Sequence, residues 1–291
     1  MSLPSRPDGG HKGTFGTILI VGGQCGRGSV MLGAPVLAAF GALRSGAGRV
    51  VLAMPEPLLH EALSLVPSAT GCPLQVDGDG VIDADAARSR LDSLVEDVQA
   101  IAVGPGLGRS EASRDVVASL LGGAGAPLVV DADALNALAD RPGMLDQVGR
   151  RCVFTPHPGE YSRLAAALDL RPYAADDASR REAASSLARR VAGVVALKGA
   201  GTVVSDGGRD WTCDSGSVVL AVPGSGDVLT GVVASLLGQH RDADPAELAA
   251  FAVRLHARAG LRWEERHGNA GMLAAELADE LPMVLRDHRN D

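Results

Sequence analysis

Short apolar runs alternate with amphipathic stretches along the chain, and this alternation predicts the secondary structure. Residues 17–23, TILIVGG, are largely β-branched and end in glycines, which is typical of a buried strand. The next stretch, GAPVLAAFGALRSG, places apolar residues at helical spacing, and GRVVLAMP then predicts a second strand. A strand, a helix and a strand within about forty residues predict a right-handed crossover between two parallel strands.

The same alternation continues toward the C-terminus. AIAVGPG, PLVVDAD, RCVFTPHPGE and GVVALKG each predict a further strand, and TVVSDGGRDWTC predicts an antiparallel hairpin. Two stripes of apolar residues at spacing four predict a helix with a broad buried face after residue 225, and two further helices are expected at 245–265 and about 271–286. The stripes are Val228, Val232, Leu236 and Leu229, Val233, Leu237.

This pattern predicts an α/β fold: a doubly wound, mostly parallel central sheet flanked by helices, with a small antiparallel hairpin at one edge. Residues 1–291 are expected to form a single domain, and residues 1–10 a disordered tail. Ligands bind such sheets at the C-terminal ends of the strands.

Composition and charge narrow the classes of function. Hydrophobic residues make up 46% of the chain and charged residues 21%, which is typical of a globular protein. The net charge of −8, with no basic run, argues against a nucleic-acid partner. No segment reaches the ~18 apolar residues that span a bilayer, and the N-terminus lacks the apolar core of a signal peptide, so a cytoplasmic protein without a membrane partner is expected. The cysteines lie far apart, which predicts free thiols rather than a zinc site.

Glycine-rich or polar stretches occupy five predicted strand ends. They are GGQCGRG, GPGLG, DADALN, TPHPGE and LKGAGT. Each alone is as typical of a tight turn as of a ligand site, but their common placement favours one shared cleft. GPGLG lacks the lysine of a P-loop and the spacing of a dinucleotide-binding loop, so it offers only accessible backbone, including that of Gly106.

Two of these stretches carry a histidine or a lysine, and each of these side chains has two interpretations. His157 lies between two prolines and is either a surface residue or a ligand contact whose position the prolines fix. Glu160, in the same stretch, is equally well explained as a cap of the following helix. Lys198 is either an edge residue that reaches solvent or a counter-charge for phosphate, and the small residues that follow it favour phosphate.

The stretch DADALN carries two carboxylates. Asp133 is expected to be the N-cap of a helix that starts near Ala134. Asp131, nearer the strand, is the better candidate for a metal or phosphate network, and Asn136 is a possible supporting residue.

The stretch GSGD precedes the broad-faced helix. Gly224, Ser225 and Gly226 expose N–H groups at the positive end of that helix, which favours a phosphate cradle. Asp227 lies in the first turn, where the helix dipole is expected to keep it ionised as a base for a substrate hydroxyl. The alternative is an ordinary acidic residue in a first helical turn.

Taken in order, HKGTFG, GAPVLAAFGALRSGAG, GPGLG, DADALN, TPHPGE, LKGAGT, GSGDVLTG and HARAG resemble the motifs of ADP/ATP-dependent NAD(P)H-hydrate dehydratases, from His11 to the C-terminus. That family belongs to the ribokinase-like superfamily. The resemblance implies a carbon–oxygen lyase that dehydrates the S epimer of hydrated NADH or NADPH (NADHX, NADPHX) with ADP or ATP as co-substrate, releasing phosphate. It also implies Mg²⁺ as cofactor and a homotetramer.

The resemblance assigns roles to individual residues. Asp227 would be the base on the ring hydroxyl and would contact the hydrated dinucleotide together with Ala34, Gly106 and His157. The adenine nucleotide would be held by Lys198, Gly199, Ala200, Gly201, Thr202 and Gly226. No protein ligand is assigned to the metal, and His256, which matches a histidine of the family, is by its own pattern a core-facing helix residue.

Two departures from the family pattern stand out. SVVLAVPGSGD replaces the usual N-P-G-M-A-T-G-G-[ST]-G-D, so Pro223 removes one possible N–H donor, and the first loop is longer and carries Arg27. Only ten residues precede HKG, so a separate NAD(P)H-hydrate epimerase is the expected functional partner. ADP is favoured as donor by analogy. The alternatives are a vitamin-precursor or sugar kinase of the same superfamily and a nucleotide-binding paralogue without turnover.

Overall fold

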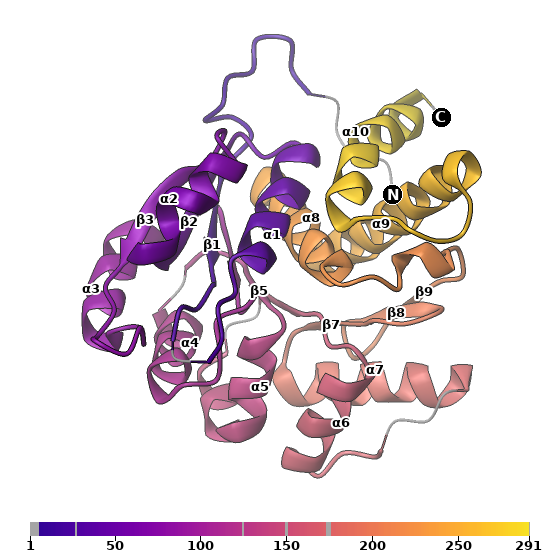
Figure 1. Cartoon of the computed structure of the whole chain (residues 1–291). Coiled ribbons are helices and arrows are strands. Elements are labelled where there is room, and N and C mark those ends of the chain that lie inside the picture. Colours follow the sequence, from indigo (N-terminus) through magenta and orange to yellow (C-terminus); the bar gives the residue numbers. More distant parts are fainter. Residues whose placement is uncertain (1–5, 27, 124, 149–150, 173–175, 291) are drawn as a thin grey trace.

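One sheet organises the part of the chain that the computed structural model describes, residues 6–26, 28–123, 125–148, 151–172 and 176–290. Its strand order is β3-β2-β1-β4-β5-β6-β7-β8-β9 (Figure 1). The strands are β1 (Thr17–Val21), β2 (Arg49–Pro55), β3 (Thr70–Leu74), β4 (Ala100–Val103), β5 (Leu128–Val130), β6 (Cys152–Phe154), β7 (Val194–Leu197), β8 (Thr202–Ser205) and β9 (Asp210–Cys213).

The strands from β3 to β7 pair in parallel, and β8 and β9 pair antiparallel at the edge. In the hairpin Val203 lies opposite Thr212, and β8 returns along β7 with Leu197 opposite Val203. The predicted mostly parallel sheet with an antiparallel edge hairpin is therefore confirmed. The order reverses between β1 and β4, which is the type of place where such sheets bind ligands.

Helices cover both faces of the sheet (Figure 1). The helices packed in the core of one face are α1 (Gly33–Arg44), α2 (Glu56–Leu65), α8 (Ser225–Gln239), α9 (Pro245–His267) and α10 (Ala274–Asn290). Those of the other face are α3 (Ala84–Val95), α4 (Glu111–Gly123), α5 (Asp133–Asp140), α6 (Pro158–Ala167) and α7 (Asp177–Val191). Two short 3-10 helices, η1 (Pro142–Gln147) and η2 (Val218–Leu220), complete the elements. Within the described ranges, none of these helices is long and apolar enough to cross a membrane.

The apolar stripes predicted for α8 are confirmed, since all six of their side chains are buried. α9 and α10 run a few residues past the predicted C-terminal ends. β3 has no counterpart in the predicted strands. Its residues TGCPL include Gly71 and Pro73, which weaken a strand pattern, and the structure places β3 at the edge of the sheet, where a proline is tolerated.

The described part of the expected tail, residues 6–10, lies against the domain rather than apart from it. Arg6 donates a hydrogen bond from Nη1 to the Gly46 carbonyl at 3.0 Å, and its guanidinium lies 3.5 Å from the centre of the Phe15 ring. Residues 1–5 lie outside the described residues, and the expectation of a disordered tail stays a prediction.

α1 and α8 pack with their backbones in direct contact, because glycines face backbone across the interface. A Cβ on Gly231 of α8 would collide with the Ala38 carbonyl of α1, and one on Gly41 of α1 would collide with the Val228 carbonyl of α8. This close approach places the N-terminus of α8 over the ends of the central strands.

We expect Gly231→Ala to lower the free energy of unfolding by about 1–3 kcal/mol or more, since the added methyl group overpacks two backbones. Urea unfolding followed by circular dichroism measures this loss. Gly123→Ala is the matched control, because a Cβ there meets no atom within 4 Å. At this helical site alanine should be neutral or stabilising by up to about 1 kcal/mol. Equal effects of both substitutions would contradict the packing argument.

Candidate active site

An ion pair at the ends of two central strands anchors the site. Asp131 follows β5 and is 1% exposed, and Lys198 follows β7 with its Nζ 2.8 Å from Asp131 Oδ1. Thr230 of α8 donates a hydrogen bond to Asp131 Oδ2 at 2.6 Å. Asp131 thus connects two strands and a helix that are remote in the sequence.

Opposing influences set the pKa values of this pair. Burial alone raises the pKa of Asp131, but the Lys198 charge and the hydrogen bonds from Lys198 and Thr230 outweigh it, so this pKa lies below its usual value. Burial likewise lowers the pKa of Lys198, but the charges of Asp131 and Glu160 outweigh it and raise this pKa. Both groups are therefore ionised at neutral pH.

Asp227, in the first turn of α8, has an unusual carboxyl group. Burial raises its pKa to about 7, and the neighbouring charges of Asp131 and Glu160 act in the same direction against Lys198. The expectation that the helix dipole keeps Asp227 ionised is therefore wrong in direction. A carboxyl group whose pKa is raised toward neutrality suits a role in which it must accept and release a proton.

Glu160 is a third carboxyl group of this cluster. Burial raises its pKa to about 7, and the Asp131 charge adds to that effect while Lys198, with Nζ at 3.9 Å from Glu160 Oε2, opposes it. Around Lys198 the structure thus gathers the carboxyl groups of Asp131, Glu160 and Asp227.

His157 begins α6 as its N-cap. Its Nδ1 accepts a hydrogen bond from Gly159 N at 2.9 Å, and Glu160 Oε2 accepts one from His157 N at 2.8 Å. This is a capping box, so the interpretation of Glu160 as a capping residue is confirmed. The His157 side chain remains 50% exposed, and burial and the Lys198 charge lower its pKa, so the imidazole is available to a ligand in its neutral form.

The N-terminus of α8 is fixed by a glycine and a histidine. Gly224 is the N-cap with φ +88°, a conformation that L residues rarely adopt, and a Cβ there would come within 3.1 Å of Ala274 Cβ. His256 of α9 donates a hydrogen bond from Nε2 to the Ser225 carbonyl at 2.9 Å, with Ser225 Oγ at 3.1 Å. Burial lowers the pKa of His256 to about 4, so it is neutral and contributes position rather than charge.

A cavity of about 690 Å³ opens beside this helix start. We call it the α8 cavity. Its walls come from the β7–β8 turn, the segment after β9, the start of α8 and the middle of α9. The lining residues predicted to bind nucleotide are Lys198, Gly199, Ala200, Gly201, Thr202 and Gly226, and His157 and Ser225 line it as well. A Cβ on Gly226 would lie 3.3 Å from Lys198 Nζ, so the lysine reaches the helix start.

Ala34 and Gly106 meet outside the α8 cavity. A Cβ on Gly106, which has φ +59°, would lie 3.3 Å from Ala34 Cβ and 2.9 Å from Met31 Cβ. The neighbouring Gly108 N donates a hydrogen bond to Asp133 Oδ2 at 2.9 Å. The prediction of Asp133 as an N-cap is therefore wrong: it lies in the first turn of α5, and its carboxylate holds the GPGLG loop instead.

Asn136 supports this side of the site. It donates a hydrogen bond from Nδ2 to Asp133 Oδ1 at 3.3 Å and accepts one from Arg163 Nε at 2.8 Å. Asp227 connects the two sides electrostatically, because its pKa responds both to Lys198 at the α8 cavity and to Asp133 beside the glycine loop. Arg27, noted in the first loop, lies outside the described residues.

Sequence reasoning missed two residues of this arrangement. Thr230 was assigned no role, although its position three residues after Asp227 puts both on one face of α8. His256 was interpreted as a core residue; it is buried, but it bonds to the backbone of the predicted cradle. Its partner lies 31 residues away, and no local pattern reveals such a bond.

Comparisons with known proteins agree with this arrangement. A family model described as NAD(P)H-hydrate dehydratase matches residues 18–283. The ADP-dependent (S)-NAD(P)H-hydrate dehydratase of Bacillus subtilis is 33% identical over 97% of this chain and 94% of its own length. The bifunctional NAD(P)H-hydrate repair enzyme Nnr of Moorella thermoacetica is 39% identical over 98% of this chain, which spans about half (52%) of that relative.

Solved structures show the same fold. The ADP/ATP-dependent NAD(P)H-hydrate dehydratase of Bacillus subtilis, co-crystallised with ATP and Mg²⁺, superposes with a TM-score of 0.76 at 31% identity and covers 99% of this chain and 95% of its own. A ribokinase-like superfamily protein of Enterococcus faecalis gives a TM-score of 0.80 at 21% identity, covering 100% of this chain and 93% of its own. The predicted ribokinase-like fold is confirmed.

We expect Lys198→Met to lower the free energy of unfolding by about 3–5 kcal/mol near pH 8, because it leaves Asp131 buried without its counter-charge. The loss should shrink near pH 5, since protonation then relieves the unpaired carboxylate. Chemical denaturation at both pH values measures it. The chain has only one other lysine, the exposed Lys12, and Lys12→Met should change stability by less than about 0.5 kcal/mol.

Proposed function

The chain belongs to the NAD(P)H-hydrate dehydratase family, and we propose that it catalyses the ADP- or ATP-dependent dehydration of the S epimer of hydrated NADH or NADPH. The reaction regenerates NAD(P)H and releases phosphate. One observation carries the proposal: Asp227, with a pKa raised to about 7, lies in the first turn of α8 beside Gly226, which lines the α8 cavity together with Lys198, and its pKa also responds to Asp133, which holds the glycine loop. This supports a proton acceptor near both proposed binding surfaces.

The two binding surfaces receive different substrates in this proposal. The adenine nucleotide occupies the α8 cavity, held by the segment from Lys198 to Thr202. Its terminal phosphate lies at Ser225 and Gly226, which line the cavity, and at the neighbouring N-cap Gly224. The hydrated dinucleotide lies on the side of Ala34 and Gly106 and reaches His157 and Asp227 with its hydrated ring. Asp131 and Asn136 support the site by holding Lys198 and Asp133.

The chemistry proceeds in two steps. Asp227 takes the proton of the ring hydroxyl, whose oxygen bonds to the terminal phosphorus of ADP or ATP while the bond from that phosphorus to the remaining nucleotide breaks. The electron pair of the ring nitrogen then expels phosphate, breaking the carbon–oxygen bond, and loss of a proton from the adjacent carbon restores the double bond. With ADP the products are NAD(P)H, AMP and phosphate. The cradle and Lys198 stabilise the charge on the transferring group.

The residues present suit a nucleotide-borne Mg²⁺. Among the described side chains no group of three or more His, Cys, Asp or Glu is arranged to hold a metal alone. Mg²⁺ needs only one or two carboxylates when phosphates and waters supply its other ligands. Glu160, whose pKa is raised to about 7 in the acidic cluster around Lys198, is the carboxylate that would hold it. The ion would neutralise the phosphate oxygens that the cluster otherwise repels.

Four finer proposals accompany this function. ADP is the preferred donor, supported by the ADP-dependent relative in Bacillus subtilis. The residues proposed for the site run from Ala34 to Asp227, which supports one catalytic domain rather than two. A homotetramer and a separate epimerase are further proposals, supported by the family resemblance, and light scattering of the purified protein measures the former.

The direct test is recovery of the reduced cofactor. Purified protein incubated with hydrated NADH, Mg²⁺ and either ADP or ATP should restore the NADH absorbance and release one phosphate per NADH. Parallel reactions with hydrated NADPH, and with nucleotide omitted, measure substrate preference and background. Failure to recover NADH with either nucleotide, or accumulation of a phosphorylated product without NADH, would refute the proposal.

We expect Asp227→Asn to bind nucleotide as the wild type does and to lose about 10²–10⁴-fold in kcat, since general base catalysis contributes that much. Calorimetry of nucleotide binding and the recovery assay measure the two effects. Asp85→Asn is the matched control, because Asp85 is an exposed acidic residue in the first turn of α3. If Asp227→Asn keeps turnover near the wild-type value, Asp227 is only a helix-start residue.

The rate should also depend on pH through Asp227. Because burial raises its pKa to about 7, kcat/KM should be constant above that pH and fall about tenfold per unit below it, as the base becomes protonated. Glu160 titrates in the same range, so the profile reports the values of the interacting pair. Steady-state rates between about pH 5.5 and 9 measure the profile, and a flat profile would contradict the role of Asp227 as base.

A further inference from the structure

Helix α9 carries an arginine at every fourth position of its exposed side. The four residues are Arg254, Arg258, Arg262 and Arg266. Like charges at this spacing repel each other unless a counter-charge lies nearby. α10 supplies it for one half of the row: Arg262 pairs with Asp287 at 3.4 Å, and Arg266 pairs with Glu280.

The other half of the row has no such counter-charge. Arg254 and Arg258 are exposed, and neither forms an ion pair with any residue in the described part of the chain. Arg254 lies only within 6.0 Å of the Phe251 ring centre. An acidic partner is therefore provided for Arg262 and Arg266 but not for these two.

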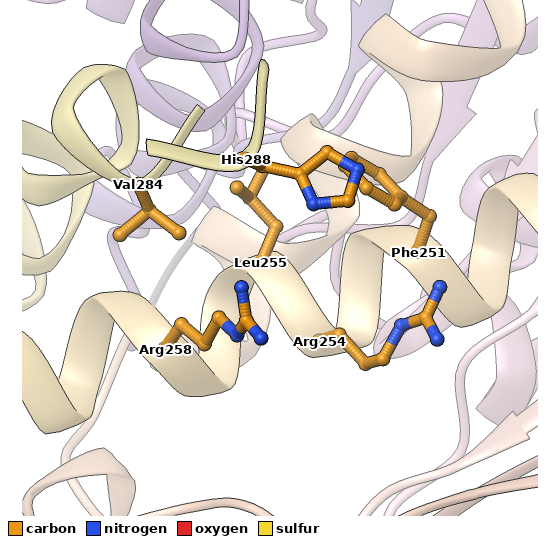
Figure 2. A pocket seen from close by; sticks show the side chains of 6 residues that line it. All are labelled: Phe251, Arg254, Leu255, Arg258, Val284 and His288. Carbon is orange, nitrogen blue, oxygen red and sulfur yellow. The ribbon is translucent and has the colours of Figure 1, made fainter. Parts of the chain in front are cut away.

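A small pocket lies between these arginines and α10. Its volume is about 140 Å³, and it is lined by Phe251, Arg254, Leu255, Arg258, Val284 and His288. Figure 2 shows the His288 imidazole on one side of the pocket and the two guanidinium groups on the other. Phe251, Leu255 and Val284 are buried and provide an apolar floor.

His288 lines this pocket with its imidazole ring. Its Nε2 is buried and has no hydrogen-bond partner, although buried polar atoms are almost always paired. Its ring is held edge-to-face against Phe251, with the ring centres 4.7 Å apart. Two guanidinium groups without counter-charge and the imidazole ring thus line the same space.

We propose that this pocket is a binding site for a tetrahedral oxyanion, with inorganic phosphate as its ligand. Phosphate oxygens match the forked N–H groups of arginine and accept a further hydrogen bond from an imidazole N–H. The volume has room for about four or five water molecules, so it suits a single phosphate and is too small for a nucleotide.

The pocket is separate from the proposed active site, although the two share α9. No residue lines both cavities: Val253, His256 and Ala257 face the α8 cavity, whereas Arg254, Leu255 and Arg258 line the pocket. The proposal of an oxyanion site is therefore independent of the proposed dehydratase activity, and a binding measurement tests it without catalytic turnover.

Equilibrium dialysis of the full-length protein against ³²P-labelled inorganic phosphate, with and without saturating ADP, tests the site. We expect one phosphate per chain to remain bound in the presence of ADP. The double variant Arg254→Gln/Arg258→Gln should bind it at least tenfold more weakly, and His288→Gln should weaken it as well. Arg181→Gln/Arg190→Gln is the matched control: it removes two exposed arginines from α7 and should bind phosphate as the wild type does.

Competition identifies the form of the ligand. Unlabelled phosphate and sulfate should displace the label, whereas phenyl phosphate, which carries the same oxyanion on a larger body, should displace it poorly. Displacement by phenyl phosphate as effective as by phosphate would assign the site to phosphate monoesters and overturn free phosphate as the ligand. Two results would overturn the site itself. One is loss of phosphate binding in the presence of ADP. The other is unchanged phosphate binding by an Arg254→Gln/Arg258→Gln variant that circular dichroism shows to be folded.

Discussion

The buried ion pair between Asp131 and Lys198 is the interaction on which the rest of the site depends. It joins the ends of β5 and β7, and Thr230 ties the same carboxylate to α8. This carboxylate thereby holds β5, β7 and α8 together at one point, although β5 and β7 are not neighbours in the sheet and Thr230 lies about a hundred residues after Asp131. Because a buried carboxylate with no partner is far more costly than a paired one, the three elements form the site together or not at all.

The other acidic groups of this cluster are poised near neutrality. Burial raises the pKa values of Asp227 and Glu160 to about 7, and the charge of Asp131 adds to this effect while Lys198 opposes it only in part. In the folded chain these groups hold their protons up to about pH 7, so they lower stability as the pH rises from their ordinary pKa values of 3.8 and 4.5 to about 7, and the same burial provides a reactive base.

Local patterns sufficed for much of the fold and for part of the site. The parallel strands, the β8–β9 hairpin and the buried face of α8 follow from periodicity within about ten residues. Strand β3 was not predicted because its Gly71 and Pro73 are compatible only with an edge strand. Tertiary structure, not the local sequence, decides which strand lies at the edge. Asp133 and Asp227 were misjudged for a related reason: the carboxylate of Asp133 bonds to Gly108, and the pKa of Asp227 depends on burial and on Asp131 and Glu160, none of which local spacing reveals.

Pro223 directly precedes Gly224, the N-cap of α8. It lacks an N–H, yet the start of α8 does not rely on that donor: Gly224 turns the chain with φ +88°, Ser225 N bonds to the Val222 carbonyl at 3.3 Å, and His256 holds the Ser225 carbonyl. His256 is neutral because burial lowers its pKa to about 4. The positive potential at this helix start therefore comes from backbone N–H groups and Lys198, and a rigid proline before the glycine preserves the geometry that presents them.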